Sequence, residues 1–337
     1  MRVQPQPQQA GSDSPLPLAG PLTAGDLLDR AFRLYRSRFG IFLLTGAVLL
    51  IPVALVSGYF LEPFFADYMQ TLEELMREPP GPEFGPLALF PGLFGDLADV
   101  LLVSLLLAAA GAIVYLSLTA QAVEALRDGP LPLMAGLRRG VNRFLPYVGM
   151  AVVQYTAIAA AAVVVLAPLI LFGVALLAVG GTDASGAPLE GGIFAAFAIA
   201  GLAVCGYGLA FLLVLAPLIY LSARWLVAPA VLVVEGAGPI DALRRSWRLS
   251  RDNVLRMVGY LVLLYILETI FVSAPVVALQ YAIMLLMPSS GAIGLMMTLP
   301  TISSSLISVF VLPFFVAAVV LLYYDLRIRG NGYAPTP

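Results

Sequence analysis

One stretch of the sequence decides the fold: GPIDALRRSWRLSRDN, residues 238–253. Its apolar residues recur at helical steps of three, four and seven, so they share one face of a helix. They are Ile240, Leu243 and Trp247, and Val254 directly after the stretch continues the same face. Arg244, Arg248 and Arg251 share another face. A helix with an apolar stripe and an arginine stripe is typical of the plane of a membrane surface, and this stretch is predicted to lie there.

Two other stretches look like copies of this helix. GDLLDRAFRLYRSRF, residues 25–39, aligns with it so that Arg33 falls on Arg248. GPLPLMAGLRRGVNRF, residues 129–144, is a fainter copy in which Arg138 matches Arg33. A long apolar segment follows each copy, and this pattern predicts three pseudo-repeats, each a cytoplasmic amphipathic elbow helix followed by a transmembrane hairpin. The repeats cover about residues 24–128, 129–237 and 238–330.

The composition indicates an integral membrane protein. Of 337 residues, 61% are hydrophobic and only 11% are charged, whereas a soluble domain carries about 25% charged residues. The chain has no histidine, which removes the commonest general base near neutral pH and the commonest metal ligand. Its single cysteine, Cys205, allows no intramolecular disulfide. All 18 basic residues are arginine.

The apolar segments predict an all-α protein with six transmembrane helices in a single membrane domain, residues 24–332. Residues 1–23 are rich in Pro, Gln and Gly and are predicted to be a disordered cytoplasmic tail; residues 333–337 form a second short tail. Each span needs about 20 apolar residues. The expected spans cover about residues 40–60, 100–123, 146–179, 193–234, 255–287 and 298–324. Arg224 and Trp225 mark the interfacial part of the fourth.

The arginines predict the topology. With six spans, both termini lie on one side, and of the 18 basic residues only Arg77 falls on the other. Because cytoplasmic loops carry the excess of arginine, we expect both termini in the cytoplasm and the acidic loop 61–98 outside it. The sequence thus predicts a multi-pass protein of a bacterial plasma membrane.

Three segments resemble a known family: GDLLDRAFRLYRSRF, APAVLVVEGAGPIDALRRSWRLSRDN and LLYYDLRIRGNGY. Together they are similar to the membrane domain found at the N-terminus of some bacterial glycerophosphodiester phosphodiesterases, which also occurs alone in six-span proteins. The resemblance covers residues 24–332. In the fused enzymes a separate soluble barrel performs the chemistry with histidines, acidic residues and a divalent metal. This chain has no histidine and no room for a barrel, so the resemblance implies the fold without the hydrolase activity.

Glu268 is the ionisable residue expected deepest in a span, within VLLYILETIFV. A carboxylate at such depth costs about 2.5–3.5 kcal/mol on insertion scales and is a functional candidate for that reason. Glu268 would carry a proton or hold a lipid or substrate group. Alternatively, it is a protonated structural residue bonded to Gln154, Gln280 or the run Ser303–Ser305.

A second constellation is expected at the cytoplasmic face, where acids near the ends of spans meet arginines of the surface helices. It is either a ring that binds lipid headgroup phosphates, because arginine matches phosphate geometry in a two-pronged manner, or a structural clasp. The acids Glu124 and Asp128 belong to the same pattern. The candidate residues are Arg33, Arg138, Glu235, Arg244, Arg248, Asp325 and Arg327.

Motifs for enzymes and nucleotide binding are missing from the sequence. There is no Gly-rich phosphate loop and no Gly-x-Ser-x-Gly, so we expect no enzyme activity, cofactor, metal or nucleic acid. The leading hypothesis is a non-enzymatic accessory or scaffold module of the bacterial cell envelope, with membrane lipids and another membrane protein as partners. The alternative is a transporter or lipid-handling protein that uses Glu268, because internal repeats and prolines within spans are transporter features.

Overall fold

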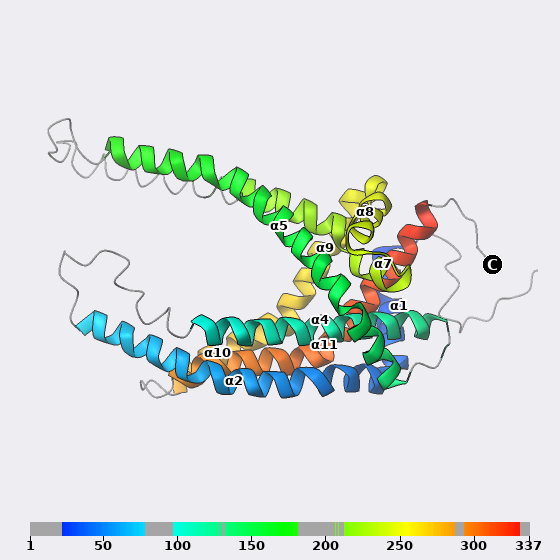
Figure 1. Cartoon of the computed structure of the whole chain (residues 1–337), viewed down its shortest axis with the longest axis horizontal. Helices are drawn as coiled ribbons and strands as arrows, with labels where there is room; N and C mark the ends of the chain where they lie inside the picture. The colour runs from blue at the N-terminus through cyan, green and yellow to red at the C-terminus, as the bar shows by residue number, and fades with distance from the viewer. Residues whose placement is uncertain are drawn as a thin grey trace, which may run out of the picture. The chain divides into compact units, whose positions relative to one another are not determined.

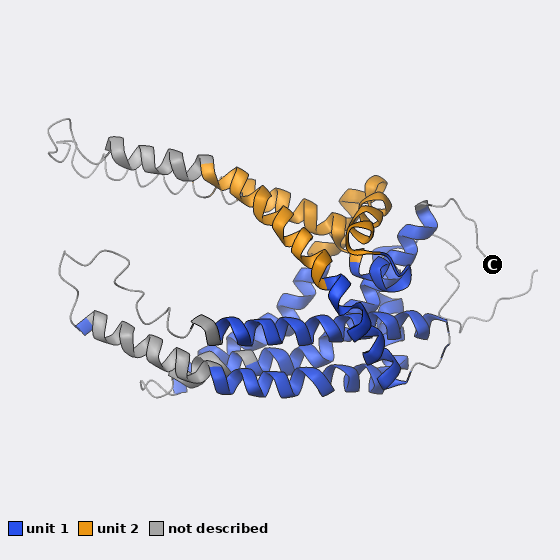
Figure 2. Ribbon diagram, in the orientation of Figure 1, with its two compact units in different colours: residues 1–147, 229–237, 263–337 blue, residues 148–228, 238–262 orange. Residues whose placement is uncertain are grey.

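The computed structural model describes residues 22–77, 97–127, 129, 132–180, 206, 208, 212–286 and 293–330. These residues form helices and the turns beside them, without a strand. The chain divides into two compact units (Figure 2). Unit 1 comprises residues 1–147, 229–237 and 263–337, and unit 2 comprises residues 148–228 and 238–262. Residues 1–21 of the first predicted tail, the whole second tail and residues 78–96 of the acidic loop lie outside the described residues.

Unit 1 is built around its last helix, α11 (Ile293–Gly330), which packs against α2 (Phe39–Arg77) and α4 (Leu97–Leu126). The three helices lie side by side in Figure 1. The centre of α11 is apolar on every face, from Val316 to Leu322, and is buried throughout. A helix that is apolar all round is the one that other helices surround.

Three further elements belong wholly to unit 1: α1 (Ala24–Ser37), the π-helix η3 (Thr269–Ser273) and α10 (Ala274–Leu286). The short helix α7 (Ala228–Val234) also belongs to unit 1, except for its first residue. Unit 2 contains a helix at residues 212–225, α8 (Pro239–Leu249) and the short 3-10 helix η2 (Arg251–Asn253). Two helices run through both units, α5 (Leu133–Gly180) and α9 (Val254–Glu268).

Within the described residues, six helices are long and apolar enough to cross a membrane, which confirms the predicted class and number of spans. They cover residues 39–60, 100–126, 133–167, 212–234, 251–286 and 302–329. Their length and composition are those of an integral membrane protein. The helix α2 continues beyond its span to Arg77, so the first part of the predicted loop 61–98 is helical.

The first predicted surface helix is α1, a separate amphipathic helix. Thr23 caps it, because its hydroxyl accepts the Asp26 N–H at 3.2 Å while the Asp26 carboxylate accepts the Thr23 N–H at 3.1 Å. The Thr23 side-chain hydrogen bond also holds the pKa of Asp26 below its usual value. Leu27, Ala31 and Leu34 lie at steps of four and three and form the buried face. The third predicted surface helix is likewise separate, as α8.

The middle repeat differs from the other two. Residues 129–144 were expected to form a separate surface helix, but α5 runs unbroken from Leu133 through this segment into the span. After Leu133 nothing in the segment ends a helix: Gly136 and Gly140 keep helical geometry and face α4 instead. The elbow is therefore absent here, and the three-repeat layout as a whole stays a prediction.

Candidate functional site

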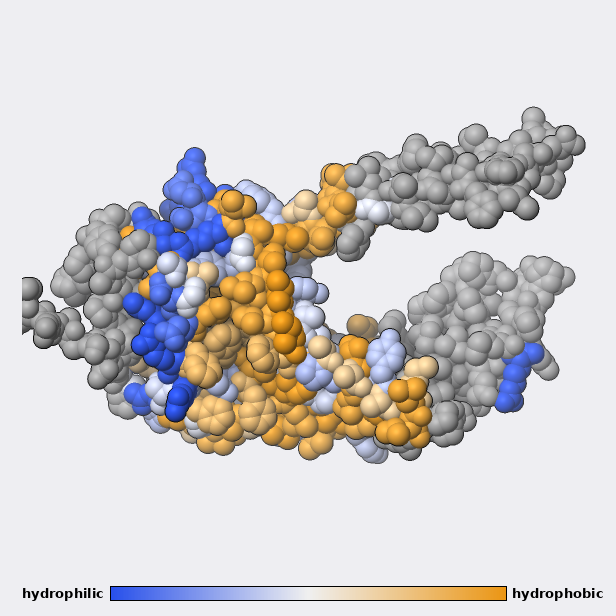
Figure 3. Space-filling model, turned by 180° about the vertical axis from the view of Figure 1, so that it is seen from behind, coloured by the Kyte–Doolittle hydropathy of each residue, from blue (hydrophilic) through white to orange (hydrophobic). Residues whose placement is uncertain are grey.

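Polar residues of unit 1 gather at one end of its helices, which we call the polar end. It comprises α1, the last turns of α4 and α11, the start of α5 and the turn after α7. Figure 3 shows hydrophilic residues concentrated there and apolar residues along the helix flanks. The polar end thus has the surface of a membrane–water boundary.

Asp325 is the buried carboxylate of the polar end, with 1% of its surface exposed. It accepts the backbone N–H of Leu22 at 2.8 Å and the Nε–H of Arg329 at 3.0 Å. Arg329 in turn donates through Nη2 to the carbonyl oxygen of Leu22 at 3.2 Å. These bonds fasten the segment that leads into α1 to the last turns of α11.

Glu235 and Gly236 form the turn that ends α7. The Tyr323 hydroxyl of α11 donates to Glu235 at 2.8 Å. Gly236 has a φ of 68°, the left-handed conformation that glycine adopts readily after a helix. Arg143 of α5 donates to the Gly236 carbonyl oxygen at 3.1 Å. The turn is therefore held from two helices, and a residue with a side chain is strained at Gly236.

Two ion pairs are more exposed. Arg139 of α5 donates to Glu124 of α4 at 2.7 Å, and Arg33 pairs with Asp29 one turn earlier in α1. Both involve half-exposed or exposed side chains, so each contributes only about 0–1 kcal/mol. They orient side chains more than they stabilise the fold.

The predicted constellation is partly brought together. Glu124, Glu235 and Asp325 all lie at the polar end and all accept hydrogen bonds. Their partners are not the arginines that the repeat alignment selects: Glu124 takes Arg139 instead of Arg138. The other predicted arginines have different places. Arg33 pairs within α1, Arg138 is exposed, Arg327 is half-buried on α11, Arg244 and Arg248 are exposed on α8 of unit 2, and Asp128 lies outside the described residues.

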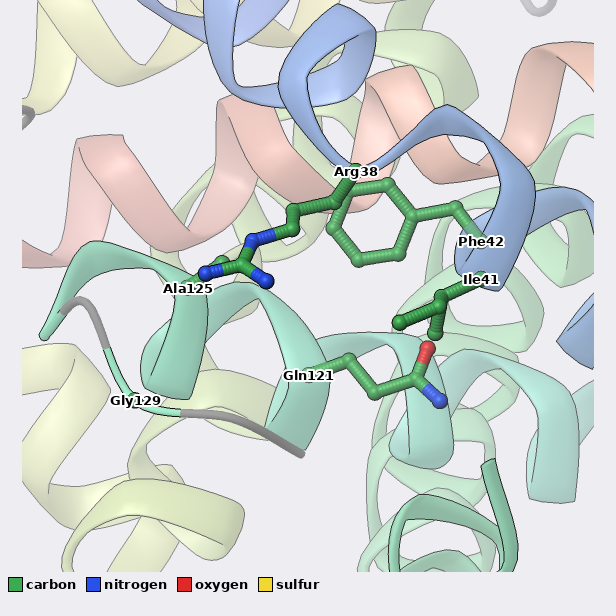
Figure 4. Close-up of a pocket in the computed structure, with 6 residues that line it drawn as sticks. All are labelled: Arg38, Ile41, Phe42, Gln121, Ala125 and Gly129. Atoms are coloured by element: carbon green, nitrogen blue, oxygen red, sulfur yellow. The ribbon is translucent and has the colours of Figure 1, made fainter. Parts of the chain in front are cut away.

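A small pocket opens at the polar end between α1, α2 and α4 (Figure 4). Arg38, the residue that caps α1, lines it together with the buried Gln121, whose amide donates to Thr45 at 2.8 Å. The other lining residues are Ile41, Phe42, Ala125 and Gly129. The pocket is partly open to solvent and has room for about one water molecule. It suits a small polar group and not a whole metabolite.

The sequence reading missed this pocket. The side chain of Arg38 makes no hydrogen bond or ion pair within the described part of the chain. The sequence did contain one signal for Arg38, because the repeat alignment matches it with Arg143. Arg143 has a defined hydrogen-bond partner in the Gly236 carbonyl oxygen.

Glu268 ends α9, immediately before the π-helix η3. The Ser273 hydroxyl donates to both of its carboxylate oxygens, at 3.1 and 3.2 Å. Glu268 and Ser273 are five residues apart, which is the repeat of a π-helix and explains why the widened turn brings them together. Ser273 was not among the partners expected from the sequence. Glu268, Gln280 and, in unit 2, Gln154 are each half-buried.

Most of the chain matches a family model. The family model described as Domain of unknown function (DUF7847) matches residues 36–326. No curated protein and no solved structure matches the chain. The resemblance to the membrane domain of glycerophosphodiester phosphodiesterases accordingly stays a prediction. Within the described residues, no three acidic or cysteine side chains come together as a metal site would require.

Proposed function

The chain belongs to the family of the Domain of unknown function (DUF7847), and from that premise we propose that it is a non-enzymatic accessory or scaffold module of the bacterial cell membrane. Its polar end faces the cytoplasm, with both termini on that side. There it contacts lipid headgroups and another membrane protein.

One observation carries this proposal: at the polar end the acids accept hydrogen bonds from within the unit, whereas several arginines have no ion pair. Glu124, Glu235 and Asp325 each accept a hydrogen bond from within the unit. Three arginines have no ion pair within the described residues: Arg36 of α1, Arg38 directly after α1 and Arg138 of α5. A guanidinium matches the oxygens of a phosphate, and each arginine near an anionic membrane surface contributes about 1 kcal/mol.

A scaffold must also present a surface to a partner, and α1 offers one at the polar end. Phe32 is 54% exposed although it is a large apolar residue. It lies on the face of α1 opposite the buried residues Leu27 and Leu34. The exposed apolar ring among arginines is typical of a protein contact at a membrane surface.

Site-specific photo-cross-linking in cells tests the scaffold. A photoreactive residue at Phe32 is expected to give one discrete protein adduct, because that position faces the proposed partner. The matched control is Leu105, which is 67% exposed on the flank of α4 and faces lipid in the proposed topology. It is expected to give lipid adducts alone. The identified partner must then show the reciprocal cross-link from its own surface; lipid adducts alone from both positions contradict the scaffold role.

A second function, lipid or solute movement, is favoured by the π-helix beside Glu268. Single π-turns inside α-helices occur frequently at functional sites, and here one begins at the residue after the carboxylate. The Ser273 hydroxyl holds the carboxylate by donating to both oxygens. A positioned acid on a transmembrane helix is able to take up and release a proton or to hold a cationic headgroup.

Replacing Glu268 by glutamine tests this second function. In liposomes that contain the purified protein and a fluorescent lipid, the wild type is expected to move lipid between leaflets faster than empty liposomes. Glu268→Gln keeps an oxygen that accepts the Ser273 hydroxyl but removes the charge, and its rate is expected to fall to that of empty liposomes. Ser273→Ala, which leaves the carboxylate in place, should retain part of the rate. Equal rates in wild type, Glu268→Gln and empty liposomes contradict lipid movement.

A further inference from the structure

Unit 2 contains a buried cation, Arg224, near the end of the helix at residues 212–225. Its exposed fraction is 5%, and it is the one arginine that is buried within the described residues. Its guanidinium carbon lies 4.1 Å from the ring centroid of Trp247 on α8 and 5.6 Å from that of Tyr220. Trp225 completes the group, 6.0 Å from Trp247 between ring centroids. We call these three aromatic residues the aromatic cage.

The cage leaves the hydrogen-bonding capacity of Arg224 largely unused. A guanidinium has five N–H donors, and the structure provides one long contact, from Nη1 to the Ser250 hydroxyl oxygen at 3.4 Å. The Nε is the one buried side-chain nitrogen or oxygen without a hydrogen-bond partner in the described part of the chain. The Ser246 hydroxyl is committed elsewhere, because it donates to the Arg224 carbonyl oxygen at 2.8 Å.

The charge of Arg224 is not balanced either. Within the described residues no carboxylate pairs with it. Burial of an ion is costly, and a ring beneath a cation returns only part of that cost. The carbonyl groups at a helix end contribute a smaller part. The rings and the helix end therefore do not fully offset the burial of the charge, and an anion bound beside Arg224 would.

We propose that Arg224 binds the phosphate group of a phosphate ester. The planar guanidinium forms two parallel hydrogen bonds with phosphate oxygens, which would occupy donors such as the free Nε. The cage supports this ligand, because tryptophan and tyrosine concentrate at the depth of phospholipid headgroups. The same chemistry serves a lipid phosphodiester and a free phosphate monoester. The site lies wholly within unit 2 and does not depend on the scaffold role proposed for unit 1.

The two tryptophans of the chain give a direct readout, because both belong to the cage. The sequence contains only Trp225 and Trp247, so tryptophan fluorescence of the full chain reports on this site alone. The purified protein in a neutral detergent is titrated with short-chain phosphatidylglycerol, with glycerol 3-phosphate and with inorganic phosphate. We expect a saturable change in wild-type fluorescence with at least one of them. A response to phosphatidylglycerol alone assigns a lipid, and an equal response to the soluble phosphates assigns a free phosphate.

Arg224→Gln is expected to weaken the apparent affinity by about tenfold or more, the effect of losing a charge-assisted hydrogen bond. Arg224→Lys keeps the charge but loses the two-pronged geometry and should lie in between. The matched control is Arg256→Gln in the same unit: Arg256 also lies over a ring, 5.3 Å from the Tyr260 centroid, but it already donates to the Tyr260 hydroxyl at 3.0 Å. Its titration should equal that of the wild type.

Three outcomes overturn the proposal. The first is a wild-type fluorescence that shows no saturable response to any of the three phosphates, and this result stands even if Arg224→Gln does not fold. The second is an Arg224→Gln titration that matches the wild type. The third is a response to acetate as strong as the response to phosphate, because a carboxylate from a protein partner would then satisfy Arg224 equally well.

Discussion

Gly140→Ala is expected to lower the free energy of unfolding by about 1–3 kcal/mol, the range for overpacking a close contact. A Cβ at Gly140 would clash with the Ser117 hydroxyl oxygen and would lie 2.6 Å from the carbonyl oxygen of Ile113. The hydroxyl is able to rotate, but the carbonyl belongs to the backbone of α4 and cannot. The helices α5 and α4 must therefore separate at their crossing, where Gly136 and Gly140 form a small-xxx-small contact of the kind that joins helices in membranes.

The measurement is a titration from mild detergent into denaturing mixed micelles, followed by far-UV circular dichroism. Gly111→Ala is the matched control, because Gly111 is also a helical glycine of unit 1 and nothing lies within 4 Å of its added Cβ. This variant should be unchanged or more stable by up to about 1 kcal/mol, the helix-propensity difference between the two residues. Equal effects of the two substitutions would contradict the close crossing of α4 and α5.

Asp325→Ala is expected to lower the free energy of unfolding by about 2–3 kcal/mol, because hydrogen bonds to charged groups are worth about 1.5–3 kcal/mol each. The substitution leaves the buried N–H of Leu22 and the Nε–H of Arg329 without their acceptor. We discount the arginine bond, since the Arg329 side chain retains 25% exposure to solvent. The first described residues would then detach from α11, and α1 would lose its anchor.

Limited proteolysis checks this second result alongside the unfolding titration. Cleavage before α1 should become faster in Asp325→Ala while α2 and α4 stay protected. Asp325→Asn keeps one oxygen for the Leu22 N–H and should show a smaller loss. Asp29→Ala removes an exposed carboxylate that pairs within α1, and its effect should stay near zero. If Asp29→Ala is as destabilising as Asp325→Ala, the hydrogen bonds that Asp325 accepts have no special role in the stability of the fold.

The candidate site was only partly predictable. Sequence reasoning placed Glu235 and Asp325 at one end of the spans, because arginines and acids cluster beside the apolar segments. It selected Arg138 as the arginine of the middle repeat, whereas Glu124 takes Arg139. It also named Arg224 only as a marker of the interface. Nothing local distinguishes a buried arginine from an exposed one, because burial depends on which helix covers it.

The π-helix beside Glu268 could not be predicted from the sequence either. Its segment, Thr269–Ser273, has ordinary helix-forming residues, and the extra residue in the turn is recognisable only from the backbone. The continuity of α5 has a related cause. Repeat alignment suggested an elbow at residues 129–144. The helix α5 continues through this segment instead, because no residue ends it there and α4 accommodates its glycines.

The sequence by itself determined the helical class, the six spans and the amphipathic helices α1 and α8. These follow from apolar length and from helical periodicity, which are properties of contiguous residues. Only the tertiary structure decided which side chains meet. The bond between Leu22 and Asp325 joins residues 303 positions apart, and the contact between Arg224 and Trp247 requires α8 to fold back on the helix at residues 212–225. Such contacts depend on the rotation and crossing of helices, which hydropathy does not encode.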